Sequence, residues 1–330
     1  MTPVPGLVYY PDNRPGITRR RAGRGWSYRA PDGTRIDDTT ERKRLDSMAV
    51  PPAYEDVWMS PKANGHLWAT GRDELERKQY RYHPEWTAHR AETKFENLAR
   101  FARHLPALRR RIRDGLSADP GSHDHALAAV LALIDRASLR VGNPDYAREN
   151  GSYGATTLQG RHVRLEEGAV RLSYTAKGGK KVRKTLKDRH LSRILHQVAD
   201  LPGRELLTWI DPEGNPRAVT SGEVNARLAD WTDGEATAKT FRTWNGSTAA
   251  LEAALRAHAD DSSITIKAMS EAAAEELSNT PTIARNSYIH PAVIDLTEAS
   301  PQLLAALRRR ESRQKGLRRA EAQLLHLLTR

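Results

Sequence analysis

The spacing of apolar residues changes near residue 90, and this change limits the folds that the chain can adopt. Before it, alternating stretches such as 66–71 predict β-strands, because successive strand residues face opposite sides of a sheet. After it, apolar residues recur at three- and four-residue spacing over 86–111 and 125–140, which predicts amphipathic helices. We therefore expect two domains, a small sheet-rich one over 1–90 and a larger, mainly helical one over 91–330.

The first domain is expected to be a small antiparallel sheet with one or two helices. Pro31-Asp32-Gly33 is a turn signal between 26–29 and 34–36, and it predicts a hairpin of these two segments. Residues 79–83 predict a further strand. Asp38, followed three residues later by Glu41, predicts the capped start of a short helix.

The second domain is expected to combine helices with one small sheet, which makes the predicted fold class α+β. Three alternating segments predict an antiparallel three-stranded sheet: 163–165, 170–176 and 182–186. Gly178-Gly179 predicts a two-residue hairpin turn, because glycine readily adopts positive φ. From Leu191 onward we expect mostly helix, apart from a loop at 211–216, with Pro301 at the start of the last helix.

Composition and motifs restrict the chemistry that is possible. The chain has no cysteine, which excludes disulfide scaffolds, Cys-ligated zinc, iron–sulfur clusters and cysteine nucleophiles. It contains no P-loop, no dinucleotide-binding glycine motif and no HExxH or paired-Asp motif, so we expect no metal, no ATP and no nucleotide cofactor. The longest apolar run, 126–134, is far shorter than the roughly 18 residues of a membrane span. Prolines interrupt the N-terminus where a signal peptide needs an apolar stretch, so a cytoplasmic location is expected.

The charge of the chain indicates the kind of partner it binds. The 53 Lys and Arg residues exceed the 41 Asp and Glu residues, for a formal net charge of +12. Because the basic residues form clusters along the whole chain, this excess favours a polyanion, either nucleic acid or an anionic membrane. We expect Arg109–Arg113 and Arg308–Arg310 to be solvated or to attract DNA in general, rather than to make specific contacts.

The remaining candidates for catalysis are arginine, lysine, histidine, asparagine and tyrosine, a set that suits phosphoryl transfer. An arginine can hold two phosphate oxygens at once, a lysine can protonate a leaving oxygen, and a tyrosine can form a covalent phosphotyrosine. Candidates of these kinds are Arg140, Lys177, Arg242 and Tyr288. Taken singly, each is more typical of an exposed charge or a packing residue.

The order of these residues along the chain resembles that of type IB DNA topoisomerases, especially the compact poxvirus-like form found in bacteria. The motifs that carry the resemblance cover nearly the whole chain: Arg77–Tyr82, Leu139–Gly142 followed by Tyr146, the hairpin Lys177, Lys239-x-x-Arg242, and Asn279-Thr-Pro with Ser-Tyr288 after it. Two positions depart from the family pattern. Glu76 stands where the family often has glycine, and Asn279 stands where many members have histidine.

The resemblance implies an enzyme that relaxes supercoiled duplex DNA without ATP or metal, by cutting one strand, allowing rotation and resealing the cut. Tyr288 would be the nucleophile and would form a 3′-phosphotyrosyl link. Arg140 and Arg242 would clamp the scissile phosphate. Lys177 would protonate the 5′-hydroxyl leaving group, with assistance from Lys239.

The resemblance also implies further contacts with DNA. Asn279 can donate a hydrogen bond to a phosphate oxygen as histidine does, but it cannot carry a positive charge. The implied DNA-binding residues are Lys78, Gln79, Tyr80, Tyr82 and Tyr146. The expected protein is a monomer that closes around duplex DNA in the nucleoid.

Two other functions are compatible with parts of the sequence. A tyrosine recombinase would use the same residue types, but recombinases usually have histidine three residues before their second arginine, where this chain has Lys239. A non-enzymatic basic DNA-binding protein would fit the composition, but it would not account for the block from Asn279 to Tyr288. Both considerations favour the topoisomerase.

Overall fold

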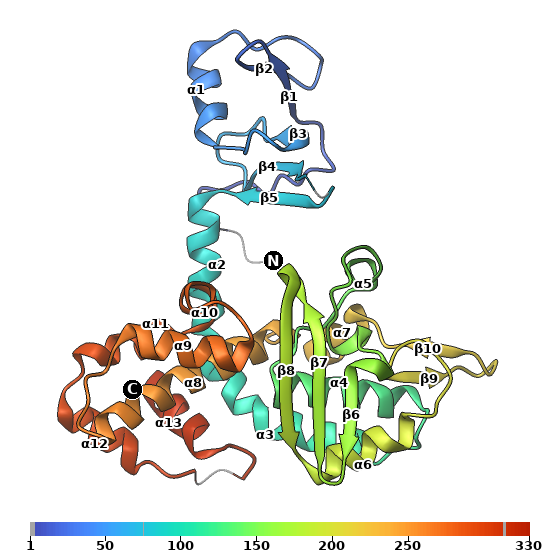
Figure 1. The fold of residues 1–330 in the computed structure, drawn as a ribbon. Coiled ribbons are helices and arrows are strands. Elements are labelled where there is room, and N and C mark those ends of the chain that lie inside the picture. The colour runs from blue at the N-terminus through green and yellow to red at the C-terminus, as the bar shows by residue number, and fades with distance from the viewer. Residues whose placement is uncertain (1–3, 75, 313–314) are drawn as a thin grey trace. The chain divides into compact units, whose positions relative to one another are not determined.

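The structure is a computed structural model that describes residues 4–74, 76–312 and 315–330. The chain divides into two compact units, Met1–Lys94 and Phe95–Arg330, and each is described by itself (Figure 1). The first unit is built on an antiparallel sheet, and the second is mainly helical with two small sheets. The predicted α+β fold class is therefore confirmed.

The sheet of the first unit has the strand order β2-β1-β3-β4-β5. Its strands are β1 (Ile17–Ala22), β2 (Gly25–Arg29), β3 (Glu55–Met59), β4 (Leu67–Arg72) and β5 (Lys78–Tyr82). One face of the sheet supplies Ile17 and Met59 to a small core, which also contains Leu45 of α1 (Thr39–Ser47) and Met48, the residue that follows this helix. The predicted cap of α1 is confirmed, since the Asp38 carboxylate accepts a hydrogen bond from the backbone N–H of residue 41 at 2.7 Å.

The hairpin predicted around Pro31–Gly33 is present only in short form: Arg29 and Arg35 form an antiparallel bridge, and the N–H of Ile36 donates to the carbonyl oxygen of Tyr28 at 2.9 Å. β2 pairs with β1 across the turn at Gly23–Arg24, whereas residues 34–36 form only an isolated bridge. The sequence did not reveal β1 because arginines 19–21 replace the apolar alternation that marks a strand. The fold accommodates the first of them against an aromatic ring, since the guanidinium carbon of Arg19 lies 3.9 Å from the ring centroid of Trp26.

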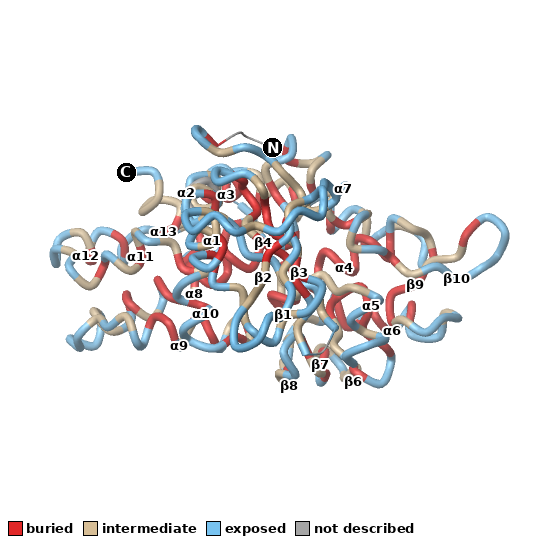
Figure 2. The backbone as a smooth tube through the Cα atoms, turned by 90° about the horizontal axis from the view of Figure 1, so that it is seen from above, coloured by how far each residue is buried: buried red, intermediate tan, exposed pale blue. Residues whose placement is uncertain are grey.

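The second unit surrounds the long helix α8 (Ala238–Ala259), most of whose residues up to Leu255 are buried. The other helices from Pro84 onward are α2 (Pro84–Glu96), α3 (Leu98–Gly115), α4 (His123–Ala137), α5 (Pro144–Asn150), α6 (Arg189–Val198), α7 (Ser221–Trp231), α9 (Ile266–Leu277), α10 (Pro281–Tyr288), α11 (Pro291–Ile294), α12 (Pro301–Arg309) and α13 (Arg319–Leu328). α3, α4, α9, α10 and α13 all contact α8. Buried positions run along α4 and α8, which form the centre of this unit (Figure 2).

The three-stranded sheet is confirmed, in the order β6 (Val163–Glu166), β7 (Ala169–Ala176) and β8 (Lys180–Lys187). The turn between β7 and β8 differs from the prediction, because Ala176 pairs with Lys180 and three residues, Lys177–Gly179, form the loop. Both glycines of this loop have positive φ, 78° and 74°. Lys177 therefore belongs to the turn itself and is exposed to solvent.

Several predicted boundaries are corrected by the structure. The helix predicted over 125–140 ends at Ala137, so Arg140 lies in the link that follows α4 rather than at its end. The loop predicted at 211–216 lies between two short paired strands, β9 (Thr208–Ile210) and β10 (Pro216–Ala218). Pro301 begins α12, which is followed by the further helix α13. In the described ranges, no helix is both long and apolar enough to cross a membrane.

Candidate active site

Four separate segments of the second unit carry the predicted catalytic residues. Arg140 follows α4, Lys177 lies in the β7–β8 turn, and Asn279 precedes α10. Lys239 and Arg242 lie in the first turns of α8, and Tyr288 is the last residue of α10. Most of these side chains come together, whereas the amino group of Lys177 extends from an exposed turn.

Two helices end in the same way immediately before Arg140 and Asn279. α4 is followed by Ser138 at φ 54°, and α9 is followed by Ser278 at φ 50°. A residue in the left-handed region ends a helix and turns the chain sharply. These turns bring the two links together, and Nη2 of Arg140 donates a hydrogen bond of 2.5 Å to Oδ1 of Asn279.

Arg242 connects the same two helix ends from α8. Arg242 is 3% exposed, and its side chain donates hydrogen bonds to the carbonyl oxygens of Ser138 and Leu277, the latter at 3.0 Å. A cation is favourable at the carboxyl ends of helices, where carbonyl groups are left without intrahelical partners. Burial lowers the pKa of the Arg242 guanidinium, and the charge of Arg140 lowers it further.

Two buried donors of this cluster have no acceptor among the described residues: Nε of Arg242 and Nδ2 of Asn279. Leaving a buried donor unpaired costs about 1–3 kcal/mol, so such groups are uncommon in a folded protein. Both belong to residues whose other polar atoms are already bonded within the cluster. A tetrahedral anion with several acceptor oxygens is the chemical group that would satisfy them.

Tyr288 lies directly against Arg242. The guanidinium carbon of Arg242 is 5.2 Å from the centroid of the Tyr288 ring. Burial by itself raises the pKa of the phenol, but the charges of Arg242, Lys239 and Arg140 outweigh it, and the net pKa is lowered. A lowered pKa increases the fraction of phenolate, which is the nucleophilic form of tyrosine.

Residues that the sequence analysis did not single out support this cluster. Lys184 of β8 donates to the carbonyl oxygen of Ala137 at 2.7 Å and also contacts Glu276. The Ser138 hydroxyl donates to the carboxylate of Glu276 at 2.5 Å, and the Asn245 amide donates to the same hydroxyl at 2.8 Å. This network holds the α4 turn against α8 and α9. Its members are far apart in sequence, so no local motif could have identified them.

Two further groups lie beside the arginines. Nζ of Lys180, the first residue of β8, donates to the backbone carbonyl of Asn279, so a second hairpin lysine reaches the cluster. Burial lowers the pKa of this lysine, and the charge of Arg140 does so as well. Tyr174 of β7 is 7% exposed, and burial raises its pKa to about 12 although Arg242 and Arg140 act in the opposite direction.

The predicted DNA contacts lie partly in the other unit. Tyr80 and Tyr82 of β5 are 49% and 44% exposed, and their rings stack with centroids 6.2 Å apart. Lys78 forms an ion pair with Asp12 at 2.6 Å, and the Gln79 amide donates to Asp73 at 2.9 Å. Lys78 and Gln79 thus have protein partners, with which a DNA ligand would compete. Tyr146, on α5 of the second unit, is 44% exposed.

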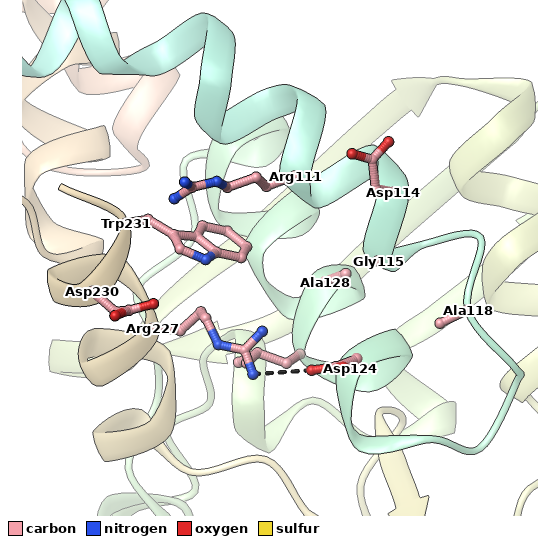
Figure 3. A pocket seen from close by; sticks show the side chains of 10 residues that line it. Arg111, Asp114, Gly115, Ala118, Asp124, Ala128, Arg227, Asp230 and Trp231 are labelled. Atoms are coloured by element: carbon pink, nitrogen blue, oxygen red, sulfur yellow. Dashed lines mark hydrogen bonds and ion pairs between the residues drawn. The ribbon is translucent and has the colours of Figure 1, made fainter.

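One cavity lies apart from this cluster. It has a volume of about 670 Å³, and the ring of Trp231 lies between Arg111 and Arg227 there, 5.6 Å from each guanidinium (Figure 3). Arg227 is also paired with Asp124 at 2.9 Å (Figure 3). None of the residues lining this cavity belongs to the cluster around Arg242. Over the part of the chain that the structure describes, no group of three or more His, Asp or Glu residues could hold a metal ion.

Known protein families match two separate stretches of the chain. Residues 83–307, more than half of the chain, match the family described as eukaryotic DNA topoisomerase I, catalytic core. Residues 25–73 match the bacterial DNA topoisomerase IB N-terminal domain. The chain is similar to the DNA topoisomerase 1B of Acanthamoeba polyphaga mimivirus, with 26% identity over 298 residues that cover 87% of this chain and 89% of the viral protein.

Proposed function

This chain belongs to the type IB DNA topoisomerase family, and on that premise we propose that it relaxes supercoiled duplex DNA through a 3′-phosphotyrosyl intermediate on Tyr288. The phenolate oxygen of Tyr288 attacks the scissile phosphorus, and the bond from phosphorus to the 5′-oxygen breaks. The leaving oxygen takes a proton and becomes a 5′-hydroxyl. Resealing is the reverse reaction, in which that hydroxyl attacks the phosphotyrosine and releases the tyrosine.

The observation that carries this proposal is the position of Tyr288 against buried Arg242, whose Nε is left without an acceptor. In the proposed reaction, Arg242 and Asn279 direct their free donors to the non-bridging phosphate oxygens, where negative charge accumulates in the transition state. Arg140, which is hydrogen-bonded to Asn279, adds a second guanidinium to the same phosphate. Because these donors are fixed before DNA binds, little reorganisation is needed during the reaction.

Lys177 is the proposed general acid. It lies at an exposed hairpin turn, where a bound duplex would meet it, and the two glycines beside it give the turn its conformation. Lys239, whose charge acts on the Tyr288 phenol, assists the same proton transfer. We propose that β5, with Tyr80 and Tyr82, contacts the DNA, as does Tyr146 of α5.

The proposed intermediate explains how the reaction proceeds without ATP or metal. The phosphotyrosine conserves the energy of the broken phosphodiester, so that religation needs no external source. Between the two steps the free 5′ end rotates about the intact strand and releases supercoils. The arginines and the asparagine supply the charge stabilisation that a metal ion provides in other phosphoryl-transfer enzymes.

The test is relaxation of supercoiled plasmid in EDTA without ATP, using wild type, Tyr288→Phe and the matched control Tyr153→Phe. Tyr153 lies outside the cluster and accepts a hydrogen bond from Arg161 at 2.9 Å. Wild type and Tyr153→Phe are expected to relax the plasmid, and Tyr288→Phe to be inactive. Denaturation during the reaction is expected to leave the 5′-labelled fragment of the cut strand attached to protein. Relaxation by Tyr288→Phe would refute the proposal.

A further inference from the structure

The face of α8 that carries Arg242 also carries Gly246, one helical turn later. Gly246 is buried in the middle of the helix, although glycine is among the least favourable residues for a helix interior. A Cβ atom at this position would lie 2.9 Å from the backbone oxygen of Tyr288 and 3.2 Å from its Cβ. It would also lie 2.8 Å from Cδ1 of Leu277. The absent side chain therefore makes room for the backbone of Tyr288.

The next residue of α8 fixes the same backbone by hydrogen bonds. The hydroxyl of Ser247 donates to the carbonyl oxygen of Tyr288 at 3.1 Å and accepts from the N–H of His290 at 2.9 Å. The end of α10 is thereby held at two points just beyond its last turn. Arg242, Gly246 and Ser247 thus place the ring and the backbone of Tyr288 against one helix.

We propose that Gly246 is a positioning residue for the nucleophile: its missing side chain lets Tyr288 approach α8 closely enough for the phenol to lie against Arg242. This inference rests on the proposed role of Tyr288. An added Cβ at position 246 would meet the backbone oxygen and the Cβ of Tyr288. Neither atom can rotate away, as the end of a flexible side chain can. An alanine at 246 would have to push the end of α10 outward.

The substitution Gly246→Ala acts in opposite directions on the helix propensity of α8 and on catalysis. Alanine is a better helix former than glycine, so the substitution favours α8 locally. A small displacement of a reacting group is costly for catalysis, and a shift of about 1 Å reduces a rate by up to about 100-fold. We therefore expect Gly246→Ala to cleave DNA about 10- to 100-fold more slowly than wild type, with unchanged DNA affinity.

The experiment is single-turnover cleavage of an end-labelled duplex at saturating enzyme, with DNA affinity measured separately. The matched control is Gly222→Ala in α7, where the nearest atom to an added Cβ, Oγ1 of Thr220, lies at an ordinary 3.7 Å. Gly222→Ala is expected to cleave at the wild-type rate. In Gly246→Ala, the pH midpoint of cleavage is expected to move upward, since the phenol moves away from Arg242. A cleavage rate of Gly246→Ala within about twofold of the wild-type rate would overturn the inference, because a displaced nucleophile is expected to react about 10- to 100-fold more slowly.

Two further variants separate a positioning role from a general packing defect. Ser247→Ala keeps the space but removes the hydroxyl that holds the Tyr288 carbonyl, and it is expected to slow cleavage without weakening DNA binding. Gly246→Ala combined with Leu277→Val removes the Cδ1 atom that the new methyl would meet. If this double variant regains the wild-type rate, the contact with Leu277 explains the defect and the inference fails. If it stays slow, contact with Tyr288 explains it.

The outcome also distinguishes this inference from the proposed function. A wild-type protein that forms no covalent complex with DNA would refute both. A wild-type protein that cleaves DNA, together with an equally active Gly246→Ala, would refute only the positioning role. Should Gly246→Ala not fold, the double variant Gly246→Ala/Leu277→Val, which removes the nearest contact, is measured in its place, and wild-type cleavage by it would overturn the inference.

Discussion

Replacing Glu321 with glutamine is expected to destabilise the second unit substantially. Glu321 lies on α13, and its side chain is completely buried. It accepts hydrogen bonds from both terminal nitrogens of Arg109 at 2.7 and 2.8 Å, and from Nη2 of Arg318 at 2.8 Å. It also accepts one from the indole N–H of Trp244 on α8 at 3.3 Å. One carboxylate therefore joins the C-terminal helix to the helix that carries Arg242.

The size of the effect follows from the pKa of this carboxyl. Burial raises the pKa of Glu321, but hydrogen bonds and charge from Arg109 and Arg318 outweigh it and lower the pKa from 4.5 to about 2. At about 1.4 kcal/mol per pKa unit, the ionised form contributes on the order of 3 kcal/mol to folding. Glu321→Gln loses this contribution and leaves Arg109 with Asp135 as its remaining carboxylate partner, so a loss of about 3–5 kcal/mol is expected.

The sign of the pH dependence follows from the same shift. The folded-state pKa is lower than that of the unfolded chain, so the stabilisation is complete above about pH 4.5 and disappears as the pH falls toward 2. The difference between wild type and Glu321→Gln is therefore expected to be largest at neutral pH. It should decrease steadily below about pH 4.5, where Glu321 in the unfolded chain takes up a proton.

Urea unfolding of the full chain, followed by far-UV circular dichroism at pH 7 and pH 3, measures both effects. The matched control is Glu271→Gln, an exposed glutamate on α9, which is expected to change the free energy of unfolding by less than about 0.5 kcal/mol. A loss below about 1 kcal/mol for Glu321→Gln at pH 7 would show that the buried pair contributes little. A difference that is equally large at pH 3 would refute the pKa argument.

Two further predictions concern the chemistry of cleavage. Burial raises the pKa of Tyr288, but the charges of Arg242, Lys239 and Arg140 outweigh burial, and the net pKa lies below the usual tyrosine value of 10.0. Cleavage is therefore expected to persist at pH values below 10.0. In Lys239→Gln, the midpoint of the single-turnover pH profile is expected to move upward, and an unchanged midpoint would contradict this account. Lys177→Ala is expected to slow cleavage of ordinary DNA by about 10²- to 10⁴-fold. It is expected to cleave DNA that has sulfur in place of the 5′-bridging oxygen near the wild-type rate, because a thiolate leaves without taking up a proton. The control is Lys181→Ala, because Lys181 is exposed on the same hairpin and donates a hydrogen bond to Thr175. A slow reaction of Lys177→Ala on the sulfur substrate would exclude Lys177 as the general acid.

The order of motifs along the chain was sufficient to predict the family, which the matches over 25–73 and 83–307 confirm. These two family matches also favour a topoisomerase over a tyrosine recombinase and over a non-enzymatic DNA-binding protein. Local patterns predicted α1 with its Asp38 cap and the sheet β6–β8, because caps and alternation depend on neighbouring residues. The same reasoning missed β1, where three arginines conceal the alternation.

Tertiary structure alone decided how the predicted residues meet. Ser138 and Ser278 turn two separate helix ends toward each other, and no spacing in the sequence relates these serines. Gly246 appears as an ordinary helix residue until the backbone of Tyr288 is found against it. Glu321 and Arg109 belong to helices at opposite ends of the second unit's sequence, and their pairing follows only from helix packing. Local conformation depends on near neighbours along the chain, whereas close approach and burial depend on which distant segments pack together.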